Sequence, residues 1–361
     1  MKVYTVTFLI NNYGSILQAF ALQSRMKEFG ADPSILVFHS NVKYSKIRYI
    51  IQVLKPVKHY SLIQRIKKTL HIRKYSVKNE KLNIFIKDNI SITSINDLNL
   101  FLNKICDKDI FLAGSDQIWS VVQNPLSAWY TLQWTKNAKN KKYSYAASIG
   151  LSKLTTNQIH AYTEGLASFE TISLREKQAV DLLAPVFVQK VRQDLDPTLL
   201  YDGAFWRKIK SKRLIEEPYI FVYMLRPDKK VIKLARRVAK EKCCKILYTG
   251  ILADKFKNMT TICDAGVEEF LSYIDNAEAV IANSFHGTLF SVLFEKPFLS
   301  VKVESTSSRV ESFLGMTGLM SQYVDNINKD YNLSVDFSTA LNVLDKERKK
   351  SLEYLEKICQ S

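Results

Sequence analysis

Short runs of β-branched and aromatic residues alternate along the chain with longer segments that have helical periodicity. The first run, residues 3–10, predicts a strand that enters a turn at residues 11–14. A helical pattern begins near Ile16 and ends at Gly30, and residues 34–38 predict a second strand. The turn contains a single glycine, too few for a G-x-G-x-x-G motif, so we expect no nicotinamide or flavin cofactor.

The alternation continues in two series of similar size. The first, assigned to an N-terminal domain of residues 1–200, adds strands at 109–113, 142–148, 171–174 and 187–191, and helices at 156–169 and 176–183. The second, assigned to residues 201–335, contains strands at 219–225, 245–248, 279–282 and 298–301, and helices at 229–240, 267–274 and 288–294. We predict an α/β protein with two Rossmann-like domains facing a cleft. A last helix at 341–358, within residues 336–361, is expected to cross back to the first domain.

Composition supports a large globular protein. With 361 residues, 47% of them hydrophobic, the chain can bury two cores. Its start lacks the features of a secretory signal, and no apolar run approaches the roughly 18 residues that span a bilayer, so we expect a cytoplasmic protein. The five cysteines are scattered and odd in number, which favours reduced thiols over a disulfide framework or a zinc site.

A formal net charge of +17 favours polyanionic partners. The excess is concentrated in a basic segment, residues 43–81, which contains twelve Lys or Arg residues and one acid, Glu80. Apolar residues alternate with the basic ones. This pattern is expected for peripheral contact with an anionic membrane and equally for a solvated insertion, and the sequence leaves both open. The chain has no recognisable nucleic-acid-binding module, so we expect no nucleic acid partner.

His286 is the histidine whose context points to chemistry. It follows the predicted strand 279–282 and lies where a helix is expected to start, between Ser284 and Thr288, with Gly287 next to it. Unpaired backbone N–H groups and the helix dipole favour an anion at such a position. An imidazole titrates near neutrality, so His286 is a candidate general acid; a structural role is the alternative for a single histidine.

Arg175 and Asp116 also follow predicted strands, at the sheet edge where open α/β sheets place ligand groups. The Arg175 guanidinium can hold a carboxylate or phosphate through two parallel hydrogen bonds, or it can form an ion pair with Glu176 or another acid. Asp116, which shares its loop with Gly114 and Ser115, can orient a hydroxyl group or accept its proton. Capping the following helix or turn is the alternative.

Other patterns are less specific. The chain has no histidine ligand cluster, EF-hand loop or Walker A sequence, so nothing visible requires a metal. Four neighbouring aromatic residues can stack on sugar rings or simply form core: Trp119, Trp129, Tyr130 and Trp134.

Seven stretches spread over the region from residue 3 to about residue 315 carry a more distinctive pattern. They are NYGSILQAFALQ (12–23), AGSDQIW (113–119), YAASIG (145–150), SLREK (173–177), DPTLL (196–200), DAGVEEFL (264–271) and ANSFHGTLFS (282–291). Together they resemble the polysaccharide pyruvyl transferase family. The resemblance implies a bacterial enzyme of surface-polysaccharide (capsule or exopolysaccharide) synthesis with a fold similar to GT-B glycosyltransferases. It also implies phosphoenolpyruvate as donor substrate, with no further cofactor, and a saccharide acceptor in which two hydroxyl groups become joined as a pyruvate ketal.

Residue by residue, the resemblance makes His286 the catalytic histidine and Arg175 the arginine that binds the donor. It places two stretches of the first domain along the cleft: the loop 114–119, and the residues Asn12, Tyr13 and Gly14. Arg309 corresponds, by a weaker match, to a second anion contact. The basic segment departs from the compact family pattern and leaves the acceptor side open.

The chemistry of phosphoenolpyruvate then suggests a mechanism in which His286 protonates C3, a sugar hydroxyl attacks C2, and a second hydroxyl displaces phosphate. A basic, cytoplasmic protein is compatible with a lipid-linked acceptor and with contact at the inner face of the cytoplasmic membrane. Two other functions stay open. One is a nucleotide-sugar glycosyltransferase of the same architecture, and the other is a non-catalytic protein that binds polyanions.

Overall fold

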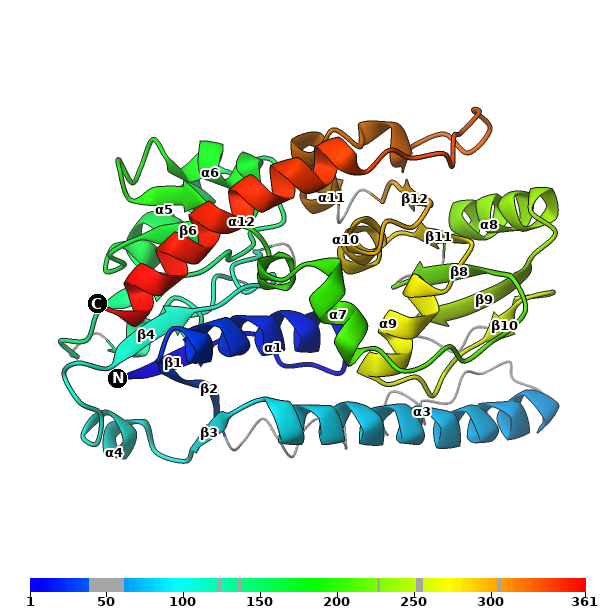
Figure 1. Ribbon diagram of the computed structural model, residues 1–361. Coiled ribbons are helices and arrows are strands. Elements are labelled where there is room, and N and C mark those ends of the chain that lie inside the picture. The colour runs from blue at the N-terminus through cyan, green and yellow to red at the C-terminus, as the bar shows by residue number, and fades with distance from the viewer. Residues whose placement is uncertain (39–61, 122–124, 136–137, 226–227, 251–255, 304–306) are drawn as a thin grey trace.

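The computed structural model describes residues 1–38, 62–121, 125–135, 138–225, 228–250, 256–303 and 307–361. Over these residues the chain forms two α/β domains, each built on a parallel sheet, and a C-terminal helix that crosses both domains (Figure 1). The predicted fold class is confirmed. The first sheet and its extension lie within residues 2–193, and the second sheet lies within residues 219–324.

The first sheet is doubly wound, and its described strand pairs are parallel. From edge to edge the strands are β3 (Ile92–Ile95), β2 (Asp32–Phe38), β1 (Lys2–Val6), β4 (Ile110–Ala113) and β5 (Lys142–Ser144). Single parallel bridges, such as that from Ala147 to Leu174, extend it towards β6 (Ile172–Leu174) and β7 (Val191–Gln193). β4 is buried along its whole length, as expected for a strand covered on both faces.

Helices connect these strands. They are α1 (Tyr13–Glu28), α3 (Leu62–Asn89), α4 (Leu98–Leu102), α5 (Thr156–Leu166), α6 (Lys177–Leu183) and the 3₁₀ helices η1 (Gln133–Thr135) and η2 (Pro197–Leu200). α1 begins where the Asn12 side chain accepts a hydrogen bond from the Gly14 N–H. It ends just before Gly30, whose φ of 81° favours glycine.

The second sheet has the strand order of dinucleotide-binding Rossmann folds. Across it lie β10 (Thr260–Thr261), β9 (Lys245–Gly250), β8 (Tyr219–Met224), β11 (Ala279–Ala282), β12 (Phe298–Val301) and β13 (Tyr323–Val324). Its helices are α7 (Gly203–Ile209), α8 (Lys229–Glu241), α9 (Val267–Asp275), α10 (Phe285–Leu293), α11 (Ser307–Thr317) and the 3₁₀ helix η4 (Met320–Gln322). β8 and β11, at the centre, are fully buried.

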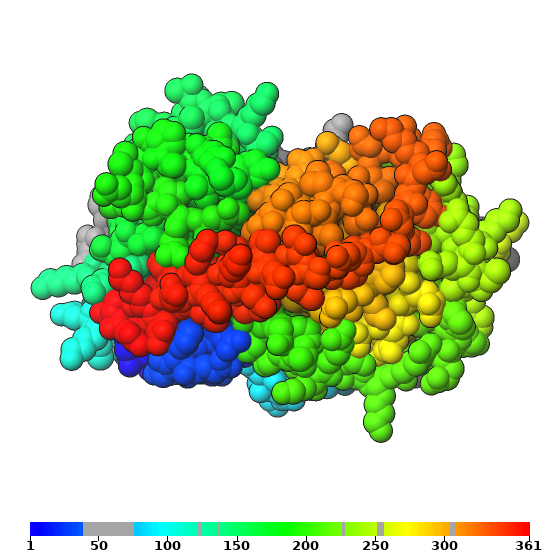
Figure 2. Space-filling model, turned by 45° about the horizontal axis from the view of Figure 1, so that its top comes forward, coloured from blue at the N-terminus to red at the C-terminus, as the bar shows by residue number. Residues whose placement is uncertain are grey.

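The helix α12 (Ser338–Cys359) joins the two domains. It leaves the second domain and runs over the surface of both, as Figures 1 and 2 show. Near its end the Tyr354 hydroxyl donates to the Ser144 carbonyl, and the Ser351 hydroxyl accepts from the Leu195 N–H. The expectation that the last helix returns to the first domain is confirmed.

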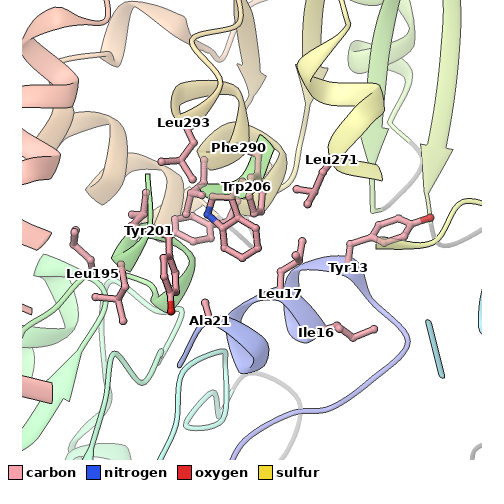
Figure 3. Close-up of a cluster of buried hydrophobic side chains, with 14 of the residues drawn as sticks. Tyr13, Ile16, Leu17, Ala21, Leu195, Tyr201, Trp206, Leu271, Phe290 and Leu293 are labelled. Atoms are coloured by element: carbon pink, nitrogen blue, oxygen red, sulfur yellow. The ribbon is translucent and has the colours of Figure 1, made fainter. Parts of the chain in front are cut away.

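The N-terminal half of α1 lies inside a core that both domains share. One cluster of buried side chains includes Leu17 of α1, Trp206 of α7, and Leu271 and Phe290 of the second domain (Figure 3). The Trp206 indole N–H also donates to the Thr198 carbonyl at 3.0 Å. Along α1 the domains therefore meet largely through packed apolar side chains.

The first strand is shorter than predicted. β1 ends at Val6, not at residue 10. The Thr7 hydroxyl donates to the Ser115 carbonyl, and the Ser15 hydroxyl donates to the Phe8 carbonyl. These side-chain bonds replace the sheet ladder, so the chain bends away from β4 and enters the cap of α1.

Two other predicted boundaries are wrong. The strand expected at 187–191 lies at Val191–Gln193. Residues 184–190 form turns and a bend instead, with Phe187 buried and Gln189 at a φ of 62°. The helix expected from residue 288 begins three residues earlier, at Phe285, because the Ser284 side chain caps it. His286 is consequently in the first turn of α10.

The basic segment is described only in part. Residues 43–61 lie outside the described residues, and residues 62–81 belong to α3, a helix that the sequence pattern did not predict. α3 runs beneath both domains (Figure 1), and its Lys81 forms an ion pair with Glu269 of α9. Among the described helices, none is both long and apolar enough to cross a membrane.

Candidate active site

His286 lies at the boundary of the two domains because of how α10 starts. β11 ends at Ala282, and α10 begins three residues later, with the Ser284 hydroxyl accepting from the Gly287 N–H. A Cβ on Gly287 would lie 2.9 Å from the Ala282 Cβ and 3.0 Å from Tyr223 of β8. Glycine therefore lets the helix pack closely on the sheet, and His286 is held in its first turn with 7% of its surface exposed.

The start of α1, in the other domain, faces the His286 imidazole. A Cβ on Gly14 would lie 2.1 Å from Nδ1 of His286 and 2.5 Å from its Cγ. No real side chain fits at such distances, so the helix backbone at Gly14 forms one wall of the imidazole site. The preceding Asn12 side chain accepts from the Tyr223 hydroxyl at 3.4 Å, so the N-cap of α1 is linked to β8 of the second domain.

Asp196 joins His286 to Arg175. Its Oδ2 lies 2.6 Å from Nη1 of Arg175 and 3.6 Å from Nε2 of His286. The longer distance is an ion pair without a direct hydrogen bond. The predicted histidine and arginine, from different domains, thus meet on a single carboxylate oxygen.

Sequence reasoning did not identify Asp196 as a site residue. The available signal was its position in the DPTLL stretch, directly before Pro197, where it caps η2. Burial alone would raise the pKa of the Asp196 carboxyl, but the His286 and Arg175 charges and the Thr198 hydrogen bond outweigh burial and hold its pKa well below the usual range. Asp196 is therefore a buried carboxylate that stays ionised.

Arg175 presents one edge of its guanidinium to Asp196 and leaves another unused. Nη1 makes the hydrogen bond, whereas Nε and Nη2, the side edge of the fork, have no hydrogen-bond partner among the described residues. Nε lies 3.7 Å from a Glu176 oxygen, and the guanidinium lies over the Phe285 ring at 4.7 Å. Burial would lower the pKa of Arg175, but Asp196 and Glu176 raise it above its ordinary value. The ion-pair alternative for Arg175 is therefore confirmed, and its binding of a donor anion stays a prediction.

Arg309, at the start of α11, is a second buried guanidinium with 8% of its surface exposed. Within the described parts of the chain no carboxylate forms an ion pair with it, and its Nε has no hydrogen-bond partner. Burial, followed by repulsion from Arg175, lowers the pKa of Arg309 to about 10. A pocket opens beside these groups, with Arg175, Asp196 and Arg309 in its wall together with apolar side chains such as Leu199 and Phe285.

Asp116 lies near this cluster, on the loop that follows β4. Its charge acts on both Arg175 and Arg309. Its backbone has a φ of 74°, in the left-handed region that disfavours a residue with a side chain, and its Oδ1 accepts from the Gln117 N–H. The carboxylate thus stabilises a local turn, as the structural alternative proposed.

Four of the predicted binding residues make contacts inside the packed protein interior. Tyr13 stacks on Phe270 at 4.3 Å, with its hydroxyl on the Ala265 carbonyl. Thr288 pairs with the Ser300 hydroxyl at 2.8 Å, behind α10. The other two pack against β1: Gly114 and Ser115. These contacts give the four residues structural roles.

The four aromatic residues of the first domain belong to its core. Trp119 is fully buried and donates to the Tyr130 carbonyl, while Trp129 and Trp134 stack on each other at 4.9 Å. Burial, and then the Asp116 charge, raise the pKa of Tyr130 to about 12. In the described part of the chain no group of three His, Cys, Asp or Glu side chains is placed to hold a metal ion.

Comparisons with known proteins agree with this architecture. The sequence model of the polysaccharide pyruvyl transferase family matches residues 12–305. Arabidopsis thaliana UGT89C1, solved with quercetin, superimposes with a TM-score of 0.55 at 9% identity, over 99% of each chain. A UDP-N-acetylglucosamine 2-epimerase from Listeria monocytogenes gives 0.51 at 11% identity, over 99% of this chain and 90% of its own. Such low identities show the fold alone, which is GT-B-like. No protein with a curated description matches the chain.

Proposed function

The chain belongs to the polysaccharide pyruvyl transferase family, and we propose that it transfers pyruvate from phosphoenolpyruvate to two hydroxyl groups of a saccharide, forming a ketal. The observation that carries the proposal is the pair of buried guanidinium groups, Arg175 and Arg309. Nε and Nη2 of Arg175 make no hydrogen bond, although Nε lies 3.7 Å from a Glu176 oxygen, and Arg309 has no anionic partner among the described residues. Such groups are expected to bind an anion at the boundary of the two domains.

The donor has the charges that this arrangement lacks. A buried, unpaired arginine is unfavourable because desolvation of its charge is not offset by an ion pair. Phosphoenolpyruvate carries a carboxylate and a phosphate close together, so each guanidinium can bind one of them. The start of α10, with Ser284 as its cap, adds backbone N–H groups and the positive end of a helix dipole.

The chemistry requires an acid near C3 of the donor. In the proposed reaction the His286 imidazolium gives its proton to C3, and the first sugar hydroxyl attacks the cationic C2. The second hydroxyl then bonds to C2 as the C–O bond to phosphate breaks. Of the two hydroxyl protons, one restores the imidazolium and the other leaves with phosphate. Arg175 and Arg309 stabilise the negative charge of the leaving group.

On the acceptor side, we propose that Asp116 orients the attacking hydroxyl or accepts its proton. Its carboxylate is half-buried and its charge acts on both arginines, which supports this part of the proposal. We further propose a lipid-linked acceptor in the cytoplasm, with the basic segment 43–81 in peripheral contact with an anionic membrane. The excess of positive charge in that segment supports this part of the proposal.

The test uses purified protein, phosphoenolpyruvate and a lipid-linked oligosaccharide extract. Mass spectrometry should show a product heavier by one pyruvic acid minus one water, with phosphate released in equal amount. His286→Ala should lower the rate by about 10²–10⁴-fold. His160→Ala is the matched control, since His160 is exposed on α5 and its ion-pair partner among the described residues is Glu164. Product formation by His286→Ala at the wild-type rate would contradict the assignment.

A nucleotide-sugar glycosyltransferase is the second candidate, because the fold also resembles that of such enzymes. UGT89C1 solved with UDP-L-rhamnose superimposes with a TM-score of 0.53 at 8% identity. A fold does not set the reaction. Transfer of a sugar from a nucleotide sugar, with no release of phosphate from phosphoenolpyruvate, would favour this alternative.

A further inference from the structure

We propose that Asp196 is a positioning residue that holds Arg175 and His286 in the geometry and charge state needed to receive the donor. The inference rests on the proposed function and deepens it, because it assigns a role to a carboxylate that neither the sequence pattern nor the reaction itself requires. The two oxygens of this side chain make different contacts.

Oδ1 of Asp196 is fixed by its own turn. It accepts from the Thr198 N–H at 3.0 Å and from the Thr198 hydroxyl at 2.6 Å, so the carboxylate caps η2 and cannot rotate freely. The side chain is completely buried, which removes water as a competing partner. Oδ2 consequently points towards the Arg175 guanidinium and the His286 imidazole.

Oδ2 determines which edge of Arg175 is available. By binding Nη1 at 2.6 Å, it leaves Nε and Nη2, the two parallel donors that match a carboxylate, without hydrogen bonds. The donor anion can therefore bind Arg175 without displacing Asp196. Removing the carboxylate would free the guanidinium to rotate and would bring its positive charge closer to that of Arg309, since each guanidinium already repels the other.

Oδ2 also supplies the negative charge next to the imidazole. At 3.6 Å from Nε2 it is close enough to pair with the ring when the ring carries a proton, and that is the form that can give a proton to C3. The other charged groups of this cluster are Arg175, Arg309, Glu176 and Asp116. Asp196 is the one described carboxylate in ion-pair contact with His286.

The test compares Asp196→Asn with Asp109→Asn. Asp109 is also a buried aspartate that accepts backbone hydrogen bonds, but it lies at the start of β4, among the first-domain turns. The first readout needs no substrate. In the NMR titration of histidine-labelled protein, the His286 signal, assigned by its loss in His286→Ala, should titrate about 1–3 pH units lower in Asp196→Asn than in wild type. Asp109→Asn should leave it unchanged.

The second readout is the pH profile of kcat with phosphoenolpyruvate. Asp196→Asn should move its alkaline limb to lower pH and reduce kcat by about 10²-fold near neutrality. If Asp196→Asn does not fold, Thr198→Val keeps the charge but loses one bond to Oδ1, and it should raise the KM for phosphoenolpyruvate several-fold.

An unchanged His286 titration in a folded Asp196→Asn protein would overturn the inference, even if the rate fell. If Asp196→Asn does not fold, an unchanged KM in Thr198→Val would overturn it as well. A shifted titration in a wild-type protein that does not turn over phosphoenolpyruvate would instead support the Asp196–His286 coupling and refute the proposed function. The role of Asp196 and the proposed transfer reaction are therefore refuted by different results.

Discussion

Replacing Gly14 with alanine adds one methyl group where the His286 imidazole now lies. The new Cβ would be 2.1 Å from Nδ1, 2.5 Å from Cγ and 2.6 Å from Cε1. Because carbon atoms in contact are separated by about 3.5–4.0 Å, the ring must move by more than about 1 Å. The movement has to occur in His286 or in the α1 backbone, since both sides are buried.

The expected loss of activity follows from that distance. A misplacement of about 1 Å in a reacting group can lower the rate by about 10²-fold, so kcat/KM of Gly14→Ala should fall by about that factor. The effect on stability should be smaller. Overpacking costs about 1–3 kcal/mol, and the higher helix propensity of alanine returns up to about 1 kcal/mol in α1.

Gly315→Ala is the matched control. Gly315 is also helical, in α11, and a Cβ there has no neighbour within 4 Å. It should keep wild-type kcat/KM and gain up to about 1 kcal/mol in the free energy of unfolding. The assay is pyruvylated product by mass spectrometry, with urea unfolding of each protein. If Gly14→Ala were as active as Gly315→Ala, the imidazole would not be held against α1, and the assembly of the site across the two domains would be refuted.

Three further changes test other parts of the account. Arg309→Met should weaken binding of phosphoenolpyruvate by about 10–100-fold in calorimetry, without lowering the free energy of unfolding, because the lost charge has no ion-pair partner among the described residues; undiminished binding would contradict its role. Burial lowers the pKa of Lys78 to about 8, so the unfolded chain binds more protons between about pH 8 and 10, and wild-type stability should rise with pH in that window. Lys78→Met should not show this rise. Its free energy of unfolding at pH 7 should exceed that of wild type by about 1–3 kcal/mol, even though the contact with the Tyr13 ring at 4.2 Å is lost. A lower free energy of unfolding at pH 7, measured by urea unfolding, would contradict this prediction. Trp206→Ala should lower the free energy of unfolding by about 3–5 kcal/mol, measured by calorimetry, because the indole is fully buried in the shared core; a loss below about 1 kcal/mol would show that the domains do not depend on it.

The sequence predicts most of the sheet because its strands are short, buried and flanked by turns. The strands β8 and β11 lie where the apolar runs predicted them, at residues 219–224 and 279–282. The helix α3 was missed because its pattern is dominated by charge, and its apolar residues form no clear stripe. Contacts with residues far away in the sequence, such as the ion pair of Lys81 with Glu269, help to hold α3 in place, and a local sequence pattern does not reveal them.

The candidate site could be predicted in part. His286 and Arg175 follow strands at the sheet edge and carry unusual local patterns, so sequence reasoning singled them out. Asp196 lies in the DPTLL stretch, but the stretch does not show its role, because that role depends on Arg175, 21 residues before it, and on His286 in the other domain. Tyr13 belongs to a strong motif, yet its ring stacks on Phe270 in the core. A motif therefore identifies residues that matter without showing which of them face a ligand.

A crystal structure with phosphoenolpyruvate bound would show whether the two domains share a donor site. We predict that the carboxylate of phosphoenolpyruvate lies on the Nε–Nη2 edge of Arg175, its phosphate contacts Arg309, and its C3 faces the His286 imidazole. Binding anywhere else, with these guanidinium groups still unoccupied, would contradict the claim that the two domains together form a site for this donor.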